Sequence, residues 1–489
     1  MTTLHLPLNR SSTVPIHRQI YDALRRAILD GLLSPGMRVP STRALAADLQ
    51  VSRLPVLAAY DQLLHEGYLE GRTGSGTYVS CAIPDDLLAP STPAGRDAGL
   101  RPTRRRPRLP APSRDEGGLG PFRMSLPALD QFPHRPWARL VAREARSLAP
   151  ADMAYGDPAG LPALRLAIAE HLRAARAVRC EAEQVIIVSG SQAALRLAAS
   201  VLLEPGDQVA MEEPGSPLTR AALGAGGAEV APIPVDEEGL SLAMLQRRAR
   251  RVRAVCLTPS HQYPLGTSMT AGRRLALLDW ARREGTWLLE DDYDSEYRYV
   301  SRPLGALQGM DRHDRVVYVG TFSKVLFPSI RIGYLVVPPS LWERLVHARE
   351  VFDLFSSALY QRAVATFLRQ GHFARHLRRM RGVYRGRRDA LLTGLVRHCA
   401  GRLTVLNADA GLHVAALLRR DLDDVDIVRR MAGRGLTATP LSACYAGASR
   451  LSGLLLGFGG STERRLLEAT KLLGEVLDEA AAEGRAGRG

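Results

Sequence analysis

From about residue 121 onward, short apolar segments alternate with longer stretches that have the periodicity of helices. Six of the apolar segments have the length of strands: residues 185–188, 208–211, 253–258, 286–290, 315–319 and 333–337. Because these runs are apolar over most of their length, both of their faces are expected to be covered. Strands that alternate with helices in this way form a mostly parallel sheet with helices on both faces. We therefore predict an α/β domain here, with a smaller α+β segment after the long helices that follow residue 340.

The first 80 residues have a different pattern. Apolar residues recur at every fourth position over residues 15–33, as in an amphipathic helix. A second short helix is expected to begin at Ser41, a favourable N-cap residue, and a third to span residues 52–66. Two short strands, residues 68–72 and 77–80, flank a glycine-rich tip. Three helices followed by a β-hairpin predict a winged helix-turn-helix.

Five residues of this head are candidates for contact with double-stranded promoter DNA. The second helix of a helix-turn-helix enters the major groove with its N-terminal residues nearest the bases. Ser52 and Arg53 occupy that end, where a serine can cap the helix and donate to a phosphate and an arginine can pair with guanine. Arg43, on the preceding helix, suits a backbone contact. Gly74 and Gly76 allow close approach to DNA because no side chain intervenes. The alternative is a winged helix that makes only protein contacts.

Residues 81–120 are rich in Pro, Gly, Ala, Arg and Asp and have no hydrophobic period. We predict a flexible linker there, between a head of residues 1–80 and a domain of residues 121–482. The arginine run of the linker could contact phosphates, although a solvated tether is the simpler interpretation. The net charge of +15 is weak evidence for nucleic acid, because the head holds eight arginines against six acidic residues.

Several classes of protein are disfavoured by composition. No apolar stretch approaches the ~18 residues that a membrane span needs. The N-terminus lacks the layout of a secretion signal, so a cytoplasmic location is expected. The five cysteines are scattered and show no paired ligand spacing, so neither a disulfide framework nor a metal site is expected.

Lysine is rare in this chain. Of 65 basic residues only Lys324 and Lys471 are lysines. Arginine forms no stable Schiff base with an aldehyde, because its guanidinium stays protonated and delocalised. Lys471 lies in an amphipathic helical stretch, where a solvated position is expected. Lys324 follows the apolar segment 315–319 and is expected at the carboxyl end of a strand, where α/β sheets bind ligands. Any lysine-dependent chemistry therefore points to Lys324.

Other segments supply what pyridoxal phosphate (PLP) needs besides an amine: an acid beside the pyridine nitrogen and a cradle for the phosphate. The sequence EDDYDSEYRY follows the predicted strand 286–290, and we select Asp291 as the acid. Tyr293 could donate its hydroxyl to the cofactor phenolate. SGSQ, at residues 189–192, ends a strand and opens a helix, which presents backbone N–H groups to a phosphate. Alone, the acidic cluster would also suit a solvated loop or a metal site.

The order of these motifs resembles known families. YGDPAG, SGSQ, EEPG, PSHQYPLG, EDDYDSEYRY and TFSK…RIGY occur as in the fold-type I aminotransferases, which residues from about 121 onward resemble. The head, with PGMRVPSTRALAADLQVSR and EGYLEGRTGSGTYV, resembles the GntR family of winged-helix regulators. Together they resemble the MocR subfamily of transcriptional regulators.

This resemblance implies roles for particular residues. Lys324 would be the Schiff-base residue, Asp291 the partner of the pyridine nitrogen and Tyr293 a neighbour of the phenolate oxygen. His261 would lie near the cofactor ring. The residues implied around the phosphate are Ser191, Gln192, Thr321, Ser323 and Arg331.

The chain departs from the aminotransferase pattern at two positions. Ser216 stands where an aromatic residue usually stacks on the ring. Leu455 stands where many relatives have the arginine that clamps the substrate α-carboxylate, and Arg450 is nearby but displaced. A bidentate clamp provides a large share of amino-acid binding energy, so its loss argues against ordinary transamination.

These observations favour a PLP-binding transcriptional regulator that senses PLP or a PLP–amine adduct. Such domains pair, and family members cross their heads over the partner's body, so a domain-swapped homodimer is expected. The alternative is a working aminotransferase with an accessory DNA-binding head. A scaffold that never binds PLP is disfavoured by the intact pair of Lys324 and Asp291.

Overall fold

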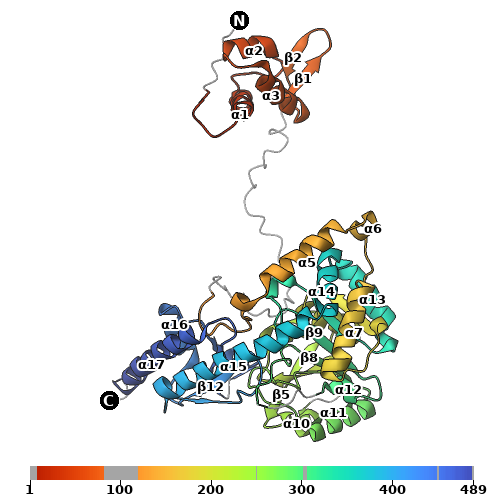
Figure 1. Ribbon diagram of the computed structural model, residues 1–489, viewed down its shortest axis with the longest axis vertical. Coiled ribbons are helices and arrows are strands. Elements are labelled where there is room, and N and C mark those ends of the chain that lie inside the picture. Colours follow the sequence, from red (N-terminus) through yellow and green to blue (C-terminus); the bar gives the residue numbers. More distant parts are fainter. Residues whose placement is uncertain (1–7, 82–118, 249–250, 301–304, 449–450, 487–489) are drawn as a thin grey trace. The chain divides into compact units, whose positions relative to one another are not determined.

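The computed structural model describes residues 8–81, 119–248, 251–300, 305–448 and 451–486. The chain divides into two compact units, Met1–Arg104 and Arg105–Gly489, which are drawn in Figure 1. The predicted linker lies almost entirely outside the described residues, as does Arg450. Across the parts of the chain that are described, no helix has the length and apolar character needed to cross a membrane.

The first unit is a winged helix-turn-helix, as predicted. Its elements are the helices α1 (Ile16–Leu29), α2 (Thr42–Asp48) and α3 (Arg53–His65) and the antiparallel strands β1 (Leu69–Arg72) and β2 (Gly76–Val79). Its core is one cluster of apolar side chains that includes Ile20, Leu24, Leu45, Val56 and Leu63. These residues come from all three helices, so the head has a core of its own.

The second unit is built on one large sheet. In spatial order, its strands among the described residues are β3 (Val185–Val188), β10 (Gly333–Val336), β9 (Val316–Thr321), β8 (Trp287–Asp292), β7 (Val252–Leu257), β4 (Gln208–Glu213), β5 (Glu229–Asp236) and β6 (Gly239–Leu240). Strand β10 runs antiparallel to both neighbours, β6 runs antiparallel to β5, and the other pairs are parallel. The predicted mostly parallel sheet is confirmed, and each of the six predicted segments overlaps one of these strands.

Strand β5 was not predicted, because Pro232 and Pro234 interrupt its pattern. The backbone nitrogen of Glu229 donates to the carbonyl of Asp207 at 2.8 Å, toward β4. Since amide groups alternate along a strand, the nitrogens of residues 232 and 234 face the opposite edge. Among the described residues, only the two-residue strand β6 pairs there, so the prolines leave the bonds to β4 intact.

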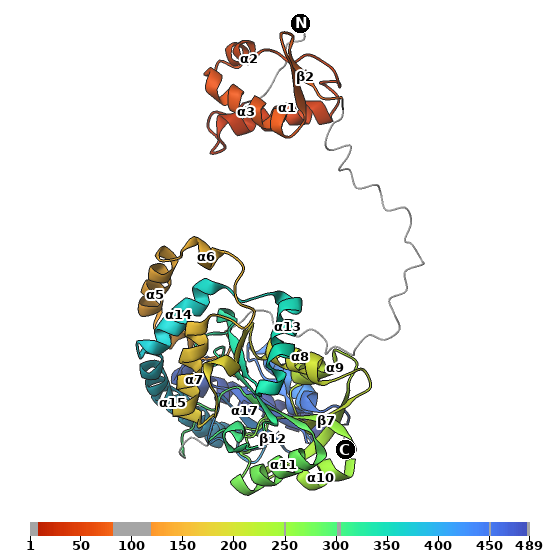
Figure 2. The ribbon, with the colours of Figure 1, turned by 90° about the vertical axis from the view of Figure 1, so that its right-hand side faces the viewer.

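Helices cover both faces of this sheet (Figures 1 and 2). One apolar cluster joins the sheet to α8 (Ser191–Leu202) and α13 (Trp342–Asp353), and another joins it to α10 (Leu242–Arg248) and α11 (Ala271–Glu284). The remaining helices of this part are α5 (His134–Arg146), α6 (Pro150–Met153), α7 (Pro162–Arg176), α9 (Pro217–Gly224), α12 (Leu307–Met310) and α14 (Ala358–Arg369). The side chains of β3, β4, β7, β8, β9 and β10 are mostly buried, so ligands are expected at the strand ends.

The expected α+β segment is a four-stranded antiparallel sheet with three helices. Its strands, in spatial order, are β11 (Leu403–Val405), β12 (His413–Leu418), β14 (Gly453–Gly457) and β13 (Thr439–Pro440). Its helices are α15 (His372–Cys399), α16 (Asp424–Gly433) and α17 (Glu463–Ala486). An arm that begins at Gly120 joins this sheet where Phe122 pairs with Gly457. The arm then continues to the site described next.

Candidate cofactor site and DNA-binding surface

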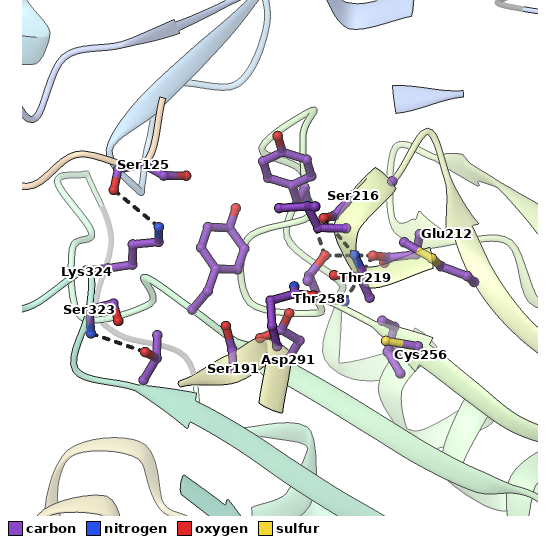
Figure 3. A pocket seen from close by; sticks show the side chains of 18 of the residues that line it. Ser125, Ser191, Glu212, Ser216, Thr219, Cys256, Thr258, Asp291, Ser323 and Lys324 are labelled. Carbon is purple, nitrogen blue, oxygen red and sulfur yellow. Dashed lines mark hydrogen bonds between the residues drawn. The ribbon is translucent and has the colours of Figure 1, made fainter. Parts of the chain in front are cut away.

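A cavity of about 280 Å³ opens at the carboxyl ends of the parallel strands (Figure 3). Its walls come from the end of β8, the loop after β9, the first turn of α8 and the segment between β4 and α9. The structure brings together here all of the residues proposed from the sequence to contact a cofactor: Ser191, Gln192, Asp291, Tyr293, Thr321, Ser323, Lys324 and Arg331.

The three consecutive carboxylates at the end of β8 have different environments, because side chains alternate along a strand. Glu290 accepts hydrogen bonds from the backbone nitrogens of Leu307 and Gln308, each at 2.8 Å. Asp292 forms a buried ion pair with Arg176 at 2.9 Å. Only Asp291 of the three lines the cavity. The strand register thus selects one acid from a cluster that the sequence alone leaves ambiguous.

Asp291 and Lys324 are both half-buried at this cavity. Burial raises the pKa of Asp291 to about 7, with the charge of Asp292 adding to the rise and Lys324 opposing it. Burial lowers the pKa of Lys324, while Asp294 and Asp291 oppose that change. The lysine Nζ donates to the backbone carbonyl of Ser125 at 3.2 Å, and Figure 3 shows this bond at the cavity wall.

The Oδ1 atom of Asp291 is buried and has no hydrogen-bond partner. A buried carboxylate oxygen is costly to leave unpaired, so such an atom in a cavity wall suits a ligand that brings a donor. The protonated nitrogen of a pyridine ring is such a donor. The residues present therefore fit PLP at this end of the cavity.

Arg331 and the start of α8 form a part of the cavity wall that suits an anion. Gly190 precedes α8 with φ of +103°, and a Cβ atom there would lie 3.3 Å from Nη1 of Arg331. A Cβ atom at Gly333 would lie 2.7 Å from Cα of Gly190. The two glycines let the RIGY and SGSQ segments approach each other, so Arg331 lies beside the start of α8. Unpaired backbone N–H groups at a helix start, together with a guanidinium, bind phosphate well.

Tyr293 connects the cavity to a buried pair behind it. Its hydroxyl lies 3.0 Å from Nδ1 of His261, and the same nitrogen lies 2.9 Å from Oδ1 of Asp294. His261 and Asp294 do not line the cavity. Burial raises the pKa of Tyr293 well above its ordinary value, so this phenol keeps its proton. His261 is thus a neighbour of Tyr293, one layer behind the cavity wall.

The two departures from the aminotransferase pattern each have a structural role. Ser216 lines the cavity and caps α9, because its side chain accepts from the backbone nitrogen of Thr219 at 3.2 Å. Leu455 is fully buried in an apolar cluster with Ala415 and Leu441 and does not line the cavity. Among the described residues, Arg331 is the one arginine in the cavity wall. It lies beside Gly190 at the start of α8, so those residues provide no second arginine for a carboxylate.

Several cavity residues were missed from the sequence. Glu212 accepts from the backbone nitrogen of Thr258 at 3.0 Å and from its hydroxyl at 2.6 Å, and burial raises the pKa of Glu212 to about 7. Its EEPG motif was noted, but nothing in the motif assigns its first glutamate to the site. Tyr263 and Ser125 also line the cavity. Ser125 lies 199 residues before Lys324, and no local pattern links two positions so far apart.

The five residues proposed for DNA contact are all exposed on the head. Arg53 begins α3, and its Nε donates to the hydroxyl of Thr42 at 3.1 Å. Ser52 occupies the N-cap position of α3, but its side chain makes no capping hydrogen bond. The predicted capping role of Ser52 is therefore wrong in this structure, although its hydroxyl remains exposed.

The backbone conformation of the wing tip explains the glycines at positions 74 and 76. Gly74 and Gly76 have φ of +74° and +116°, which side-chain-bearing residues rarely adopt. A Cβ atom at Gly76 would also lie 3.0 Å from Nε of Arg38. The turn itself therefore requires glycine at both positions, whether or not DNA approaches them.

Comparison with known proteins agrees with both units. A family profile described as "Aminotransferase class I and II" matches residues 129–453, and one described as "Bacterial regulatory proteins, gntR family" matches residues 16–79. In fold, the chain is similar to the crystal structure of LysN, an alpha-aminoadipate aminotransferase from Thermus thermophilus complexed with N-(5'-phosphopyridoxyl)-L-leucine. The TM-score is 0.69 at 29% identity, covering 74% of this chain and 92% of that one.

Two curated regulators match over nearly their whole length. The probable rhizopine catabolism regulatory protein MocR of Rhizobium meliloti is 42% identical over 470 residues, 96% of this chain and 95% of that protein. The HTH-type pyridoxine biosynthesis transcriptional regulator PdxR of Corynebacterium glutamicum is 34% identical over 467 residues, 95% of this chain and 97% of that protein. With a winged helix at one end and an aminotransferase-like domain at the other, the chain belongs to the MocR subfamily of GntR-type transcriptional regulators.

Proposed function

We propose that this regulator senses PLP: the head binds promoter DNA, and capture of PLP at Lys324 changes that binding. One observation carries the proposal. Lys324 and the unpaired Oδ1 of Asp291 lie in the wall of the same cavity, which also contains Arg331 and the first turn of α8. An amine, an acid and an anion cradle are the groups that PLP requires.

Each side chain has a task in this proposal. Bound PLP supplies an aldehyde that reacts with an amine and a ring that withdraws electrons. Lys324 provides the amine, and burial already lowers its pKa, which increases the fraction that is neutral and nucleophilic. Asp291 accepts from the ring nitrogen. Arg331 and the amides of α8 hold the phosphate. Tyr293 donates to the phenolate oxygen.

Sensing is favoured over turnover by the burial of Leu455. A leucine that is fully buried in an apolar cluster leaves no cation at that position of β14 for a substrate carboxylate. The name of one relative, a regulator of pyridoxine biosynthesis, supports an effector of the vitamin B6 class. PLP itself, or its adduct with an amine, is the effector that these observations favour.

A homodimer is part of the proposal. Met153, Tyr155 and Val351 are large apolar residues with exposed fractions of 69%, 85% and 70%. Val351 lies on α13, whose last residue, Asp353, accepts from Ser189 of the SGSQ segment at 3.3 Å, and Tyr155 packs edge-on against Phe355. Exposed apolar side chains gathered beside a site mark an interface. We propose a second copy of this chain as its partner, so that PLP can bias the relative placement of two heads.

Reductive trapping tests the site. Borohydride treatment of the full-length protein with PLP, followed by digestion and mass spectrometry, should place the pyridoxyl group on Lys324. Only Lys471 and the N-terminal amine compete, because the chain has just two lysines. Lys471→Ala is a matched control, since Lys471 is exposed on α17. Labelling of the Lys324→Ala variant at the unsubstituted level would contradict the assignment, as would label that is confined to Lys471.

Stopped-flow spectra test whether sensing or turnover follows. A PLP-loaded protein that is mixed with a panel of amino acids should keep its visible PLP band if it only senses. If the visible PLP band is replaced by the spectrum of pyridoxamine phosphate and a keto acid is released, the aminotransferase alternative is established instead.

A further inference from the structure

Tyr293 and Asp294 compete for one nitrogen atom. Nδ1 of His261 lies 2.9 Å from Oδ1 of Asp294 and 3.0 Å from the hydroxyl of Tyr293. A ring nitrogen either donates through one N–H or accepts through one lone pair. The protonation of this nitrogen therefore decides whether the phenol gives its own proton to the histidine or keeps it for another acceptor.

The imidazole is held tightly in place. His261 and Asp294 are 3% and 2% exposed. Gly411 has φ of +76°, and a Cβ atom there would overlap the His261 ring. On another side, a Cβ atom at Gly266 would lie 3.4 Å from Nε2. The ring has no room to turn over, so Nδ1 stays toward Asp294 and Tyr293.

The surroundings fix which nitrogen carries the proton. Nε2 of His261 is buried and has no hydrogen-bond partner. A proton there would leave an N–H donor unpaired, which is costlier than an unused lone pair. A proton on Nδ1 instead donates to the Asp294 carboxylate in a charge-assisted hydrogen bond. Both facts place the proton on Nδ1, whether the ring is neutral or cationic.

We infer that His261 and Asp294 form a positioning pair that points the hydroxyl proton of Tyr293 into the cavity. With Nδ1 committed as a donor, the phenol oxygen can accept from the histidine but cannot give its proton to it. The proton is left for an acceptor at the cavity, where Tyr293 is part of the wall. This inference rests on the proposed function, in which that acceptor is the phenolate oxygen of PLP.

Within the described part of the chain, none of the other groups around these side chains shows a hydrogen bond to the Tyr293 hydroxyl. His413, whose ring centroid lies 5.3 Å from that of His261, has a pKa lowered to about 4 by burial. Its Nε2 donates to the carbonyl of Pro264 at 3.1 Å. Tyr263 contacts Tyr293 edge-on, with ring centroids 6.0 Å apart. The carboxylates of Asp291 and Glu212 and the amine of Lys324 act on this region through their charge.

Spectroscopic pH titration of the PLP-loaded, full-length protein tests this inference. A hydrogen bond donated to the phenolate lowers the pH midpoint of the visible absorbance change. Tyr293→Phe removes the donor and should raise the midpoint by about one pH unit. Asp294→Asn should also raise it, because the same change beside a buried imidazole in serine proteases leaves the wrong tautomer, and Tyr293 can then donate to Nδ1.

The sign of the Asp294→Asn effect separates positioning from simple charge. The negative charge of Asp294 raises the pKa of Lys324, so loss of charge alone would lower the midpoint. In a chain that already carries Tyr293→Phe, Asp294→Asn should show only this downward effect. His261→Asn keeps an N–H donor near the Nδ1 position, so its midpoint should stay close to that of the unsubstituted protein.

The outcomes distinguish this inference from the proposed function. A PLP band whose midpoint falls or stays unchanged in Asp294→Asn would overturn the positioning role alone. So would a midpoint in His261→Asn that rises as far as in Tyr293→Phe. Absence of any PLP band in the unsubstituted protein would overturn the proposed function, and this inference with it.

Discussion

Replacement of Asp291 by asparagine should stabilise the PLP-free protein in alkaline solution while it weakens PLP binding. Burial raises the pKa of the Asp291 carboxyl from 3.8 to about 7. The folded chain therefore holds this proton more tightly than the unfolded chain does. For a group whose pKa is raised by folding, the free energy of unfolding falls as pH rises between the two pKa values. For Asp291 this fall runs from about pH 4 to about pH 7, and the free energy of unfolding is constant above pH 7. The full difference between the two pKa values corresponds to about 4 kcal/mol above pH 7.

Asparagine at this position carries no charge and avoids that cost. Its amide is still a buried polar group without a partner, which costs roughly 1–3 kcal/mol. The variant should therefore be more stable than the unsubstituted protein by about 2 kcal/mol at pH 8.5. At pH 5 the carboxyl is neutral in the folded chain and costs less, so the two proteins should be about equally stable.

Urea denaturation followed by tryptophan fluorescence measures this difference without PLP. All four tryptophans lie beyond residue 120, so the signal reports on the aminotransferase-like domain alone. Asp292→Asn is the contrast: its carboxylate forms a buried ion pair with Arg176 at 2.9 Å, and the change should destabilise the protein at both pH values because it leaves a buried guanidinium without its counter-charge. An Asp291→Asn protein that is less stable at pH 8.5, or whose advantage does not grow with pH, would refute the reasoning.

Three further predictions follow from the same contacts. Gly190→Ala should weaken PLP binding about tenfold, measured by absorbance titration, because Gly190 has a positive φ and adjoins Arg331; Gly226→Ala, whose Cβ would meet open space, should leave PLP binding unchanged. Lys324→Ala, in the absence of PLP, should speed amide hydrogen exchange in residues 123–128, because the bond to the Ser125 carbonyl is lost. Equal exchange rates in the Lys324→Ala and Lys471→Ala variants would contradict a stabilising role for this bond. Arg53→Ala should weaken binding to the promoter about tenfold in fluorescence anisotropy, and unchanged affinity would remove α3 from the DNA interface.

Much of the fold could be predicted because it depends on patterns local in the sequence. Runs such as 185–188 and 315–319 are apolar on both faces, and this already implies a covered sheet. Because the chain has only two lysines, the sequence singles out Lys324 without any knowledge of which segments lie close together in space. Strand β5 escaped because Pro232 and Pro234 suggest a loop, and only the register with β4 reveals that their nitrogens face the other edge.

The site was harder to predict from the sequence where it depends on contacts between segments that are far apart in the chain. Asp291 was selected from three neighbouring acids, and the alternation along β8 is what turns it alone toward the cavity. The contact of Ser125 with Lys324 spans most of the domain and leaves no sequence pattern. The capping role assigned to Ser52 was wrong because residue type fixes which groups are available, whereas the side-chain rotamer decides which are used.

The central claim is that PLP acts on DNA binding through Lys324. Fluorescence anisotropy with the chain's own upstream DNA, measured with and without PLP, tests it most directly. The account predicts that PLP shifts the binding curves of the unsubstituted protein and of Lys471→Ala, while Lys324→Ala binds the same DNA and does not respond. A PLP response that persists in Lys324→Ala, or no binding of the DNA under either condition, would contradict it.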